Sequence, residues 1–404
     1  MKFQNLARKF QRVWREEGWK AAVGRVAHFA GNTEGRKERR IDSRKAKKEK
    51  GTVLFINGCW AKTPIRYRVL HQMEQLREAG IPCNKVYFED LELEMEENYK
   101  VFVIYRSEYI DILGEFIELA KQHHKKIFFD IDDLIFDTSY TDQVPFVKEM
   151  PPETKAVFDG VTKRIQKTVR ACESAITTTE ALADELKKYM PEVLINRNVA
   201  SKEMVVCSEK AYQEKDGQAE GRVVLGYFSG SLTHNQDFEI VRPAVMRIME
   251  EYDWVDLLLV GELEASDQLR KFGNRIIQKG MVDWRKLPEM IIRADINLAP
   301  LEDTLFNRAK SEIKWIEAAL VRVPTVASKM GAFETMIDDG VTGFLADNTN
   351  DAWYFALKEL IKDKEYREKV GKQAYQYVIQ NCTTAAKAEY YGNIIEAAAR
   401  LADG

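Results

Sequence analysis

Short apolar runs that alternate with helical stretches constrain the fold of this 404-residue chain more than any other feature. One series of such runs occupies residues 52–178, and a second occupies residues 223–346. Short apolar strands separated by helices form parallel sheets that are covered on both faces. We therefore expect an α/β fold with two doubly wound, Rossmann-like parallel-sheet domains. The strand ends of both sheets would face one cleft, where open α/β sheets bind ligands.

The two series give the following elements. The expected strands are Thr52–Asn57, Asn84–Phe88, Lys100–Tyr105, Lys126–Ile131 and Ala175–Thr178, then Val223–Phe228, Val255–Val260, Arg275–Lys279, Asp295–Ala299, Thr325–Ser328 and Gly343–Ala346. The expected helices are residues 65–79, 108–123, 154–172 and 180–189, then 236–251, 284–293, 309–321 and 350–363.

Charge and polarity divide the chain into four parts. Residues 1–50 hold 16 Lys and Arg against 6 Asp and Glu, whereas the whole chain has a net charge of −3. We expect the connection between the two domains to lie in the polar stretch 196–222. We expect an N-terminal arm and tether over 1–50, an N-terminal domain over 51–205 and a C-terminal domain over 206–375. The last part, 376–404, is expected to be a helix that crosses back to brace the N-terminal domain.

The basic arm leaves two interpretations open. Its first part has the pattern of two basic amphipathic helices with Trp14 and Trp19 near the margins, and residues 31–50 lack apolar periodicity, which is typical of a solvated tether. An anionic membrane surface attracts such helices. A helical arm packed on the protein's own body or on a second subunit has the same pattern. The oligomeric state does not follow from the sequence.

Composition also narrows the class of protein. No run approaches the roughly 18 apolar residues that span a bilayer, and no signal peptide is visible, so we expect a cytosolic protein. If the arm binds lipid, the protein would be peripheral at the inner face of the membrane. The five cysteines show no metal-binding spacing, so we expect reduced cysteines and no metal site. A nucleic-acid partner is not expected.

The stretch Asn307–Ser328 combines a polar loop, a helix and a short strand. The start of a helix favours an anion because its N–H groups are free and its dipole is positive there. The polar residues expected at this start are Asn307, Arg308, Lys310 and Ser311. Lys314 and Glu317 lie at the margin of the apolar stripe, and the Glu317 carboxylate needs a partner. A ligand hydroxyl pair, such as that of a ribose, or a structural lysine would serve.

Two motifs of the first domain also carry candidate site residues. Arg66 and Arg68 fall in the first turn of a helix, where cations are disfavoured. Either an acceptor or phosphate anion or a salt bridge to the acidic segment 89–97 would explain them. The run F-D-I-D-D-L-I-F-D places Asp130, Asp132 and Asp133 after a strand, where repulsion calls for a cation, a metal or a polar substrate. Capping of a helix is the alternative for one of them.

Two backbone-rich loops complete the candidate site. The turn after the first strand of the second domain contains Gly230 and Ser231, which would bring backbone N–H groups and a hydroxyl to a ligand. His234 in the same loop is more typical of a loop histidine than of a base. The segment 331–334 follows another strand and, with Lys310 and Ser311, would surround a diphosphate.

These residues resemble a known family. The runs S-E-I-K-W-I-E-A-A-L-V-R-V-P-T-V-A-S and G-A-F-E-T-M-I-D-D-G-V-T-G-F-L-A resemble the donor-binding signature of group 1 (family 4 type) retaining glycosyltransferases of the GT-B fold. The runs R-Y-R-V-L, A-G-I-P and D-I-D-D-L-I-F-D resemble a branch of the family that makes bacterial surface polysaccharides.

The resemblance implies roles for individual residues. Glu317 matches the second glutamate of the family's E-x7-E motif, which binds the nucleotide ribose, whereas Ala309 stands at the first glutamate, for which Asn307 or Glu312 would substitute. The family usually has an arginine and a lysine after the first strand of the second domain. This basic pair is absent here, because Ser231 and residues 235–236 occupy those positions. Its charge would then come from Lys310, with Arg308 or Lys314. The family's first-domain histidine corresponds to Asp132 or Asp133.

The sequence therefore predicts a retaining glycosyltransferase that moves a sugar from a nucleoside diphosphate sugar to a lipid-linked surface glycan. Asp132 or Asp133 would orient the acceptor or the reacting sugar, and no metal or other cofactor would be required. The residues expected to hold the donor are Gly230, Ser231, Asn307, Arg308, Lys310, Ser311, Lys314 and Glu317. One alternative is a catalytically silent GT-B scaffold, because of Ala309 and the missing basic pair. Another is a metal-dependent D-x-D transferase with one mixed sheet.

Overall fold

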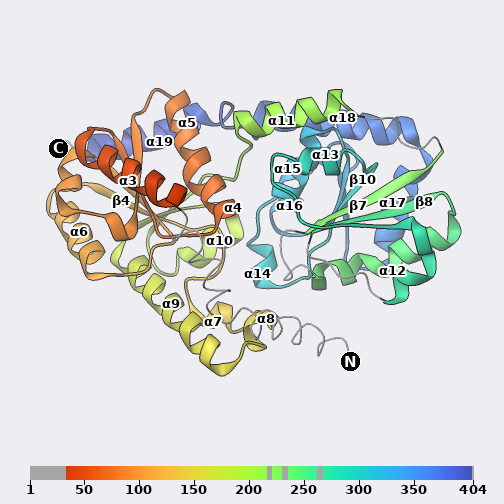
Figure 1. The fold of residues 1–404 in the computed structure, drawn as a ribbon, viewed down its shortest axis with the longest axis horizontal. Helices are drawn as coiled ribbons and strands as arrows, with labels where there is room; N and C mark the ends of the chain where they lie inside the picture. Colours follow the sequence, from red (N-terminus) through yellow and green to blue (C-terminus); the bar gives the residue numbers. More distant parts are fainter. Residues whose placement is uncertain (1–32, 216–220, 230–234, 262–266, 403–404) are drawn as a thin grey trace.

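The computed structural model describes residues 33–215, 221–229, 235–261 and 267–402 (Figure 1). Within these residues the chain forms two lobes, each built on a six-stranded parallel sheet with helices on its faces. The expectation of two doubly wound α/β domains is confirmed, and the single mixed sheet of a D-x-D transferase is excluded. Every strand pair within the two sheets is parallel.

The N-terminal sheet has the order β2-β1-β3-β4-β5-β6. Its strands are β1 (Val53–Asn57), β2 (Cys83–Tyr87), β3 (Val101–Tyr105), β4 (Lys126–Asp130), β5 (Ser174–Thr177) and β6 (Glu192–Ile195). The helices of this lobe include α5 (His71–Glu78), α6 (Asp111–Gln122), α7 (Thr138–Thr141), α8 (Pro145–Lys148), α9 (Pro152–Ala171) and α10 (Glu180–Leu186). Tyr105 pairs with Asp130, so the residues that follow β3 and β4 leave the sheet side by side.

The C-terminal sheet has the order β12-β11-β10-β7-β8-β9. Its strands are β7 (Val223–Ser229), β8 (Val255–Gly261), β9 (Ile276–Lys279), β10 (Ile296–Ala299), β11 (Thr325–Ser328) and β12 (Phe344–Ala346). The helices of this lobe include α11 (Lys202–Gln213), α12 (Asn235–Glu251), α13 (Leu287–Ile291), α14 (Leu305–Arg308), α15 (Ile313–Leu320), α16 (Gly331–Met336), α17 (Asn350–Lys362) and α18 (Lys364–Asn381).

The chain passes between the lobes twice, and the two passages are bonded to each other. The backbone N–H of Ala200 donates to the carbonyl of Cys382 over 2.8 Å, and that of Thr384 donates to the carbonyl of Ala200 over 2.8 Å. The first passage precedes α11, which packs on α13 and α15 of the second domain. The expected boundaries at 205 and 375 therefore fall inside α11 and α18, a few residues from the passages themselves.

The final helix, α19 (Ala388–Leu401), packs on the N-terminal lobe (Figure 1). Tyr391 and Ile395 of this helix are buried in one apolar cluster with Val53 and Phe55 of β1. Burial of these large side chains gives the last helix its stability, because each contributes roughly 1.5 to 3 kcal/mol when removed from water. The last part of the chain therefore holds the two lobes together.

The expected tether over residues 31–50 is wrong for the part that the structure describes. Residues 33–48 form α3 (Thr33–Lys48), which packs on β2. Ala46 is buried against the N-terminal core, and Arg39 pairs with Asp90 at 2.7 Å. Residues 1–32 lie outside the described residues. Among the helices that are described, none is both long enough and apolar enough to cross a membrane.

The stretch around residue 309 also differs from the expected single helix over 309–321. Asn307 and Arg308 belong to α14, residues 309–312 form the connection, and α15 begins at Ile313. The four polar residues at 307, 308, 310 and 311 are therefore spread over a short helix and a loop. The expectation that all four lie at one helix N-terminus is wrong.

Candidate active site

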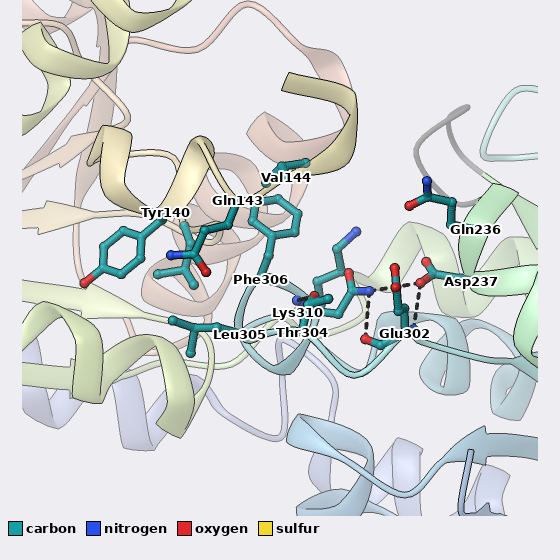
Figure 2. A pocket seen from close by; sticks show the side chains of 12 residues that line it. Tyr140, Gln143, Val144, Gln236, Asp237, Glu302, Thr304, Leu305, Phe306 and Lys310 are labelled. Carbon is teal, nitrogen blue, oxygen red and sulfur yellow. Dashed lines mark hydrogen bonds between the residues drawn. The ribbon is translucent and has the colours of Figure 1, made fainter. Parts of the chain in front are cut away.

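A pocket lies between the two lobes at the carboxyl ends of their strands (Figure 2). Tyr140, Gln143 and Val144 line its N-terminal side, and the opposite side comes from the start of α12 and from the segment 302–310. Its volume is about 580 Å³, including space that is open to solvent. The cleft that the sequence predicts between the two domains is therefore present.

A hydrogen-bond network around Asp237 forms one wall of this pocket (Figure 2). The Asn307 side-chain amide donates to Asp237 Oδ1 and to the carbonyl of Glu302, each over 3.0 Å. The backbone N–H of Glu302 also donates to Asp237 Oδ1 over 2.9 Å. Both amide hydrogens of Asn307 are therefore used within the protein. Asn307 lines the pocket as expected, and its side chain fixes the loop between β10 and α14.

Two lysines supply positive charge near this wall. Lys310 lines the pocket, with Nζ 5.3 Å from the centre of the Phe306 ring. Lys314 Nζ is buried, has no hydrogen-bond partner among the described residues and lies 4.6 Å from the centre of the Tyr227 ring. Burial lowers the pKa of Lys314 to about 8, and the nearby Lys310 adds to the shift while Asp237 opposes it. A buried ammonium without an acceptor is costly, so an anionic ligand would stabilise it.

Arg308 and Ser311 do not contribute to the pocket in the expected way. The Arg308 guanidinium forms two hydrogen bonds to the Asp303 carboxylate at the surface, of 2.6 and 2.8 Å. The Ser311 hydroxyl accepts a hydrogen bond of 3.1 Å from Asn198, which belongs to the passage between the lobes. Neither residue lines the pocket in this structure, and their roles in donor binding stay predictions.

Ala309 stands at the position of the missing first glutamate, and Glu312 was a predicted substitute for it. Ala309 is buried with Leu134 in the apolar cluster of the N-terminal domain, and its carbonyl accepts from the Thr179 hydroxyl over 3.0 Å. A carboxylate at this position would be buried between the domains. Glu312 does not substitute for it, because its side chain is buried 3.7 Å from Arg197 and is absent from the pocket lining.

Glu317 of α15 is held by residues from the other domain. The Tyr67 hydroxyl donates to Glu317 Oε1 over 2.8 Å, and Arg66 Nη2 lies 3.8 Å from the same oxygen. Burial raises the pKa of Glu317, while Arg66 and the Tyr67 hydrogen bond oppose the shift. The carboxylate also lines a second, smaller pocket between α11, α13 and α15. The sequence predicted that Glu317 needs a partner but did not identify which one.

Arg68 has a structural role. Its fully buried guanidinium forms hydrogen bonds of 2.9 and 2.7 Å to the two carboxylate oxygens of Asp130. It also donates to the carbonyl of Asn196 over 2.7 Å. The predicted contact of Arg68 with an acceptor or phosphate is therefore wrong. The alternative, a salt bridge to the acidic segment 89–97, is wrong for both arginines. Arg66 approaches the carboxylate of Glu317, and Arg68 pairs with the carboxylate of Asp130.

Asp132 and Asp133 lie after β4 and share one arginine that sequence reasoning missed. Arg106 Nε donates to Asp132 Oδ1 over 2.7 Å, its Nη2 bonds Asp133, and the Tyr105 hydroxyl donates to Asp132 over 2.9 Å. Burial raises the pKa of Asp132, which Arg106 opposes. Arg106 has a φ of 44°, a conformation that non-glycine residues rarely adopt and that clusters at functional sites.

The carboxylates of the D-x-D sequence face different partners. Asp130 accepts from Arg68, and Asp132 accepts from Arg106 and Tyr105, so the two side chains do not converge on one position. Among the residues that the structure describes, no cluster of His, Cys, Asp and Glu is arranged to hold a metal ion. Gly230 and Ser231, which were predicted to hold the donor, lie outside the described residues.

Comparison with known proteins relates the C-terminal domain to a family. Residues 223–363 match the family model for group 1 glycosyl transferases. Comparison with curated protein sequences found no match.

Solved structures show the same two-domain architecture over most of the chain. A glycosyltransferase from Rickettsia africae has a TM-score of 0.61 at 11% identity, covering 86% of this chain and 98% of its own. The sucrose-phosphate synthase from Thermosynechococcus elongatus has a TM-score of 0.56 at 15% identity, covering 86% and 99%. HepE from Anabaena, solved with UDP-glucose, has a TM-score of 0.56 at 13% identity, covering 86% and 100%. This likeness shows that the chain has the fold of these proteins, which is the GT-B fold.

Proposed function

We propose that this glycosyltransferase moves a sugar from a nucleoside diphosphate sugar to a lipid-linked surface glycan, with retention of configuration. The C-terminal domain would hold the donor and the N-terminal domain the acceptor. The complex of HepE with UDP-glucose supports a nucleotide sugar as the donor. The short motifs shared with the surface-polysaccharide branch support the acceptor class.

The buried ammonium of Lys314 is the observation that carries this proposal. Lys310 lines the pocket, Lys314 lies behind it close enough for the two charges to interact, and among the described residues Lys314 Nζ has no hydrogen-bond acceptor. A diphosphate between the two lysines would supply that acceptor and would replace the absent basic pair of the family. As the bond from the sugar to the diphosphate breaks, negative charge grows on the leaving oxygen, and both ammonium groups would stabilise it. A metal is not needed for this step in the proposed scheme.

The remaining site residues would position the two substrates. Glu317 would accept hydrogen bonds from the ribose hydroxyls, because its carboxylate lines the small pocket beside Trp284. On the acceptor side, Asp132 and Asp133 would orient the attacking hydroxyl or the reacting sugar, and Arg106 would hold both carboxylates in place. A separate general base is not required when the leaving diphosphate takes the proton of the incoming hydroxyl on the same face.

Calorimetric titration with UDP, GDP, ADP and dTDP tests the diphosphate assignment. Loss of a hydrogen bond to a charged group costs about 1.5 to 3 kcal/mol, so Lys314→Met should weaken the best ligand roughly 10- to 150-fold. Lys372→Met is the matched control, since Lys372 is exposed on α18 of the same domain. Unchanged affinity in a folded Lys314→Met variant would refute the assignment.

The ribose assignment has its own test. A 2′,3′-dideoxy analogue of the best nucleotide should bind the wild-type protein more weakly, because it lacks the hydroxyls that Glu317 would bind. The same analogue should lose no affinity relative to the parent nucleotide in Glu317→Ala. Equal losses in both proteins would place the ribose elsewhere.

The membrane proposal now concerns residues 1–32 only, because α3 is part of the folded domain. Flotation with liposomes that contain anionic lipid should carry the full chain upward and leave a variant that begins at residue 33 in the lower fraction. Equal flotation of the two proteins would assign the basic segment to protein contacts.

A further inference from the structure

Arg66 and Tyr67 reach from the N-terminal domain into the region of Glu317. Both belong to the π-helical turn Arg66–Leu70 that follows α4 (Lys62–Ile65), and Tyr67 is buried in an apolar cluster made mostly by the C-terminal domain. The Tyr67 hydroxyl donates to Glu317, and the Arg66 guanidinium lies 4.4 Å from the centre of the Trp284 ring. One dipeptide of the first domain therefore occupies both the Glu317 carboxylate and a face of the Trp284 ring in the second domain.

These two contacts have the chemistry that a nucleoside would provide. A hydroxyl on the Glu317 carboxylate corresponds to a ribose hydroxyl. A flat, delocalised guanidinium over an indole corresponds to a base stacked on an aromatic ring. The other guanidinium near this ring belongs to Arg285, whose Cζ lies 4.5 Å from the ring centre.

The Glu317 carboxylate is largely covered while the dipeptide is in place. The Glu317 side chain is 18% exposed, and the Arg66 side chain that approaches it is 9% exposed. The Tyr67 hydroxyl donates to Glu317 Oε1 over 2.8 Å. A ribose can therefore bond this oxygen only if the groups that already hold it withdraw, and those groups come from the other domain.

The closed contact also leaves polar groups unsatisfied. Arg66 is 7% exposed, and within the part of the chain that the structure describes its Nε and Nη1 atoms are buried without a hydrogen-bond partner. Buried donors without acceptors oppose the contact that buries them. The dipeptide is therefore held mainly by the Tyr67 hydrogen bond, by aromatic stacking and by the 3.8 Å approach of Arg66 to Glu317, so a ligand with better hydrogen bonding can replace it.

We propose that Arg66 and Tyr67 occupy the nucleoside subsite in the ligand-free protein and that donor binding requires their withdrawal with the N-terminal domain. This inference rests on the proposed function, because it takes Glu317 as the ribose ligand. The acceptor domain then acts as an internal competitor of the donor. The measured affinity for nucleotide equals the intrinsic affinity multiplied by the fraction of molecules in the open form.

Removal of the Tyr67 hydroxyl tests this competition. Tyr67→Phe keeps the ring in the apolar cluster and deletes the hydrogen bond to Glu317, which shifts the equilibrium toward the open form. A typical hydrogen bond changes an equilibrium about 2- to 12-fold, so nucleoside diphosphate should bind Tyr67→Phe tighter by a factor in this range. The matched control is Tyr366→Phe, which deletes a hydroxyl bonded to the Gly340 carbonyl within the C-terminal domain, at 2.9 Å.

The outcomes separate this inference from the proposed function. Tighter binding by Tyr67→Phe with unchanged binding by Tyr366→Phe supports the inference. Unchanged or weaker binding by a folded Tyr67→Phe variant overturns it, since Tyr67 would then be inert or would position Glu317 for the ligand, while the proposed function stands. Absence of nucleotide binding in the wild-type protein and in Tyr67→Phe would refute the proposed function and the inference together.

A second measurement reports the domain movement directly. Small-angle scattering of the wild-type protein should show a larger radius of gyration with saturating nucleoside diphosphate than without it. A radius that stays the same or decreases on binding would contradict withdrawal of the N-terminal domain, whatever the affinity of Tyr67→Phe.

Discussion

Replacement of Glu312 by glutamine should make the stability of this protein less dependent on pH. The Glu312 side chain is 1% exposed, both carboxylate oxygens are buried without a hydrogen-bond partner, and the nearest cation, Arg197, is 3.7 Å away and also pairs with Glu180. Burial raises the pKa of Glu312 to about 7, against an ordinary value of 4.5. The folded protein therefore prefers the protonated carboxyl.

The sign and size of the effect follow from these two values. Between pH 4.5 and 7 the folded state binds the proton more tightly than the unfolded state, so the wild-type protein loses stability as the pH rises through this window. A difference of about 2.5 pKa units at 1.36 kcal/mol per unit gives a penalty of about 3 kcal/mol, fully present above pH 7. Glu312→Gln removes the charge at nearly constant volume and so removes the penalty.

Urea unfolding at pH 4.5 and at pH 8, followed by tryptophan fluorescence, measures this difference. Trp315 lies on α15, three residues from Glu312, so the fluorescence reports on the relevant domain. The stability of Glu312→Gln relative to wild type should increase by up to about 3 kcal/mol between the two pH values. Glu173→Gln, at an exposed position, is the control. Parallel pH dependence of Glu312→Gln and wild type would refute the reasoning.

Three further predictions follow from buried groups. The affinity for a nucleotide sugar should fall as the pH rises above about 8, where free Lys314 loses its proton, and calorimetry should show a flat profile for Lys314→Met. Arg68→Met should destabilise the N-terminal domain by about 3 to 5 kcal/mol in urea unfolding, because the Asp130 carboxylate stays buried without its cation; a loss below 1 kcal/mol would contradict this. Gly371→Ala should lower the melting temperature, since the added Cβ would lie 2.1 Å from the Arg322 carbonyl oxygen; an unchanged melting temperature would show that α18 can move away.

The strands could be predicted because their sequence pattern is local. In eleven of the twelve described strands most residues are apolar or β-branched, whereas in the edge strand β9, Ile276–Lys279, half of them are. β6 was missed because four residues with an exposed glutamate do not form a recognisable strand pattern. α3 was missed for a related reason, since its stability depends on ion pairs such as that between Arg39 and Asp90, 51 residues apart.

From the sequence, a site residue could be recognised only when its side chain, such as a charged group in an apolar setting, needed a partner. Glu317 and the arginines at 66 and 68 were identified as charges that need an explanation, but their partners depend on how the domains pack. Arg106 was missed because its role depends on the register of β3 and β4, which places it beside Asp132. A charged residue directly after an apolar strand, next to another strand with the same feature, is the signal that would have indicated it.

Release of nucleoside diphosphate from nucleotide sugars, without an acceptor, tests the central claim most directly. The account predicts slow hydrolysis of one nucleotide sugar by the wild-type protein, a large loss of this activity in Lys314→Met, and normal activity in Lys372→Met. If no nucleotide sugar is hydrolysed by the folded wild-type protein, or if Lys314→Met releases product at the wild-type rate, the donor site proposed around Lys314 is wrong. Complete inactivity would favour a scaffold with the GT-B fold.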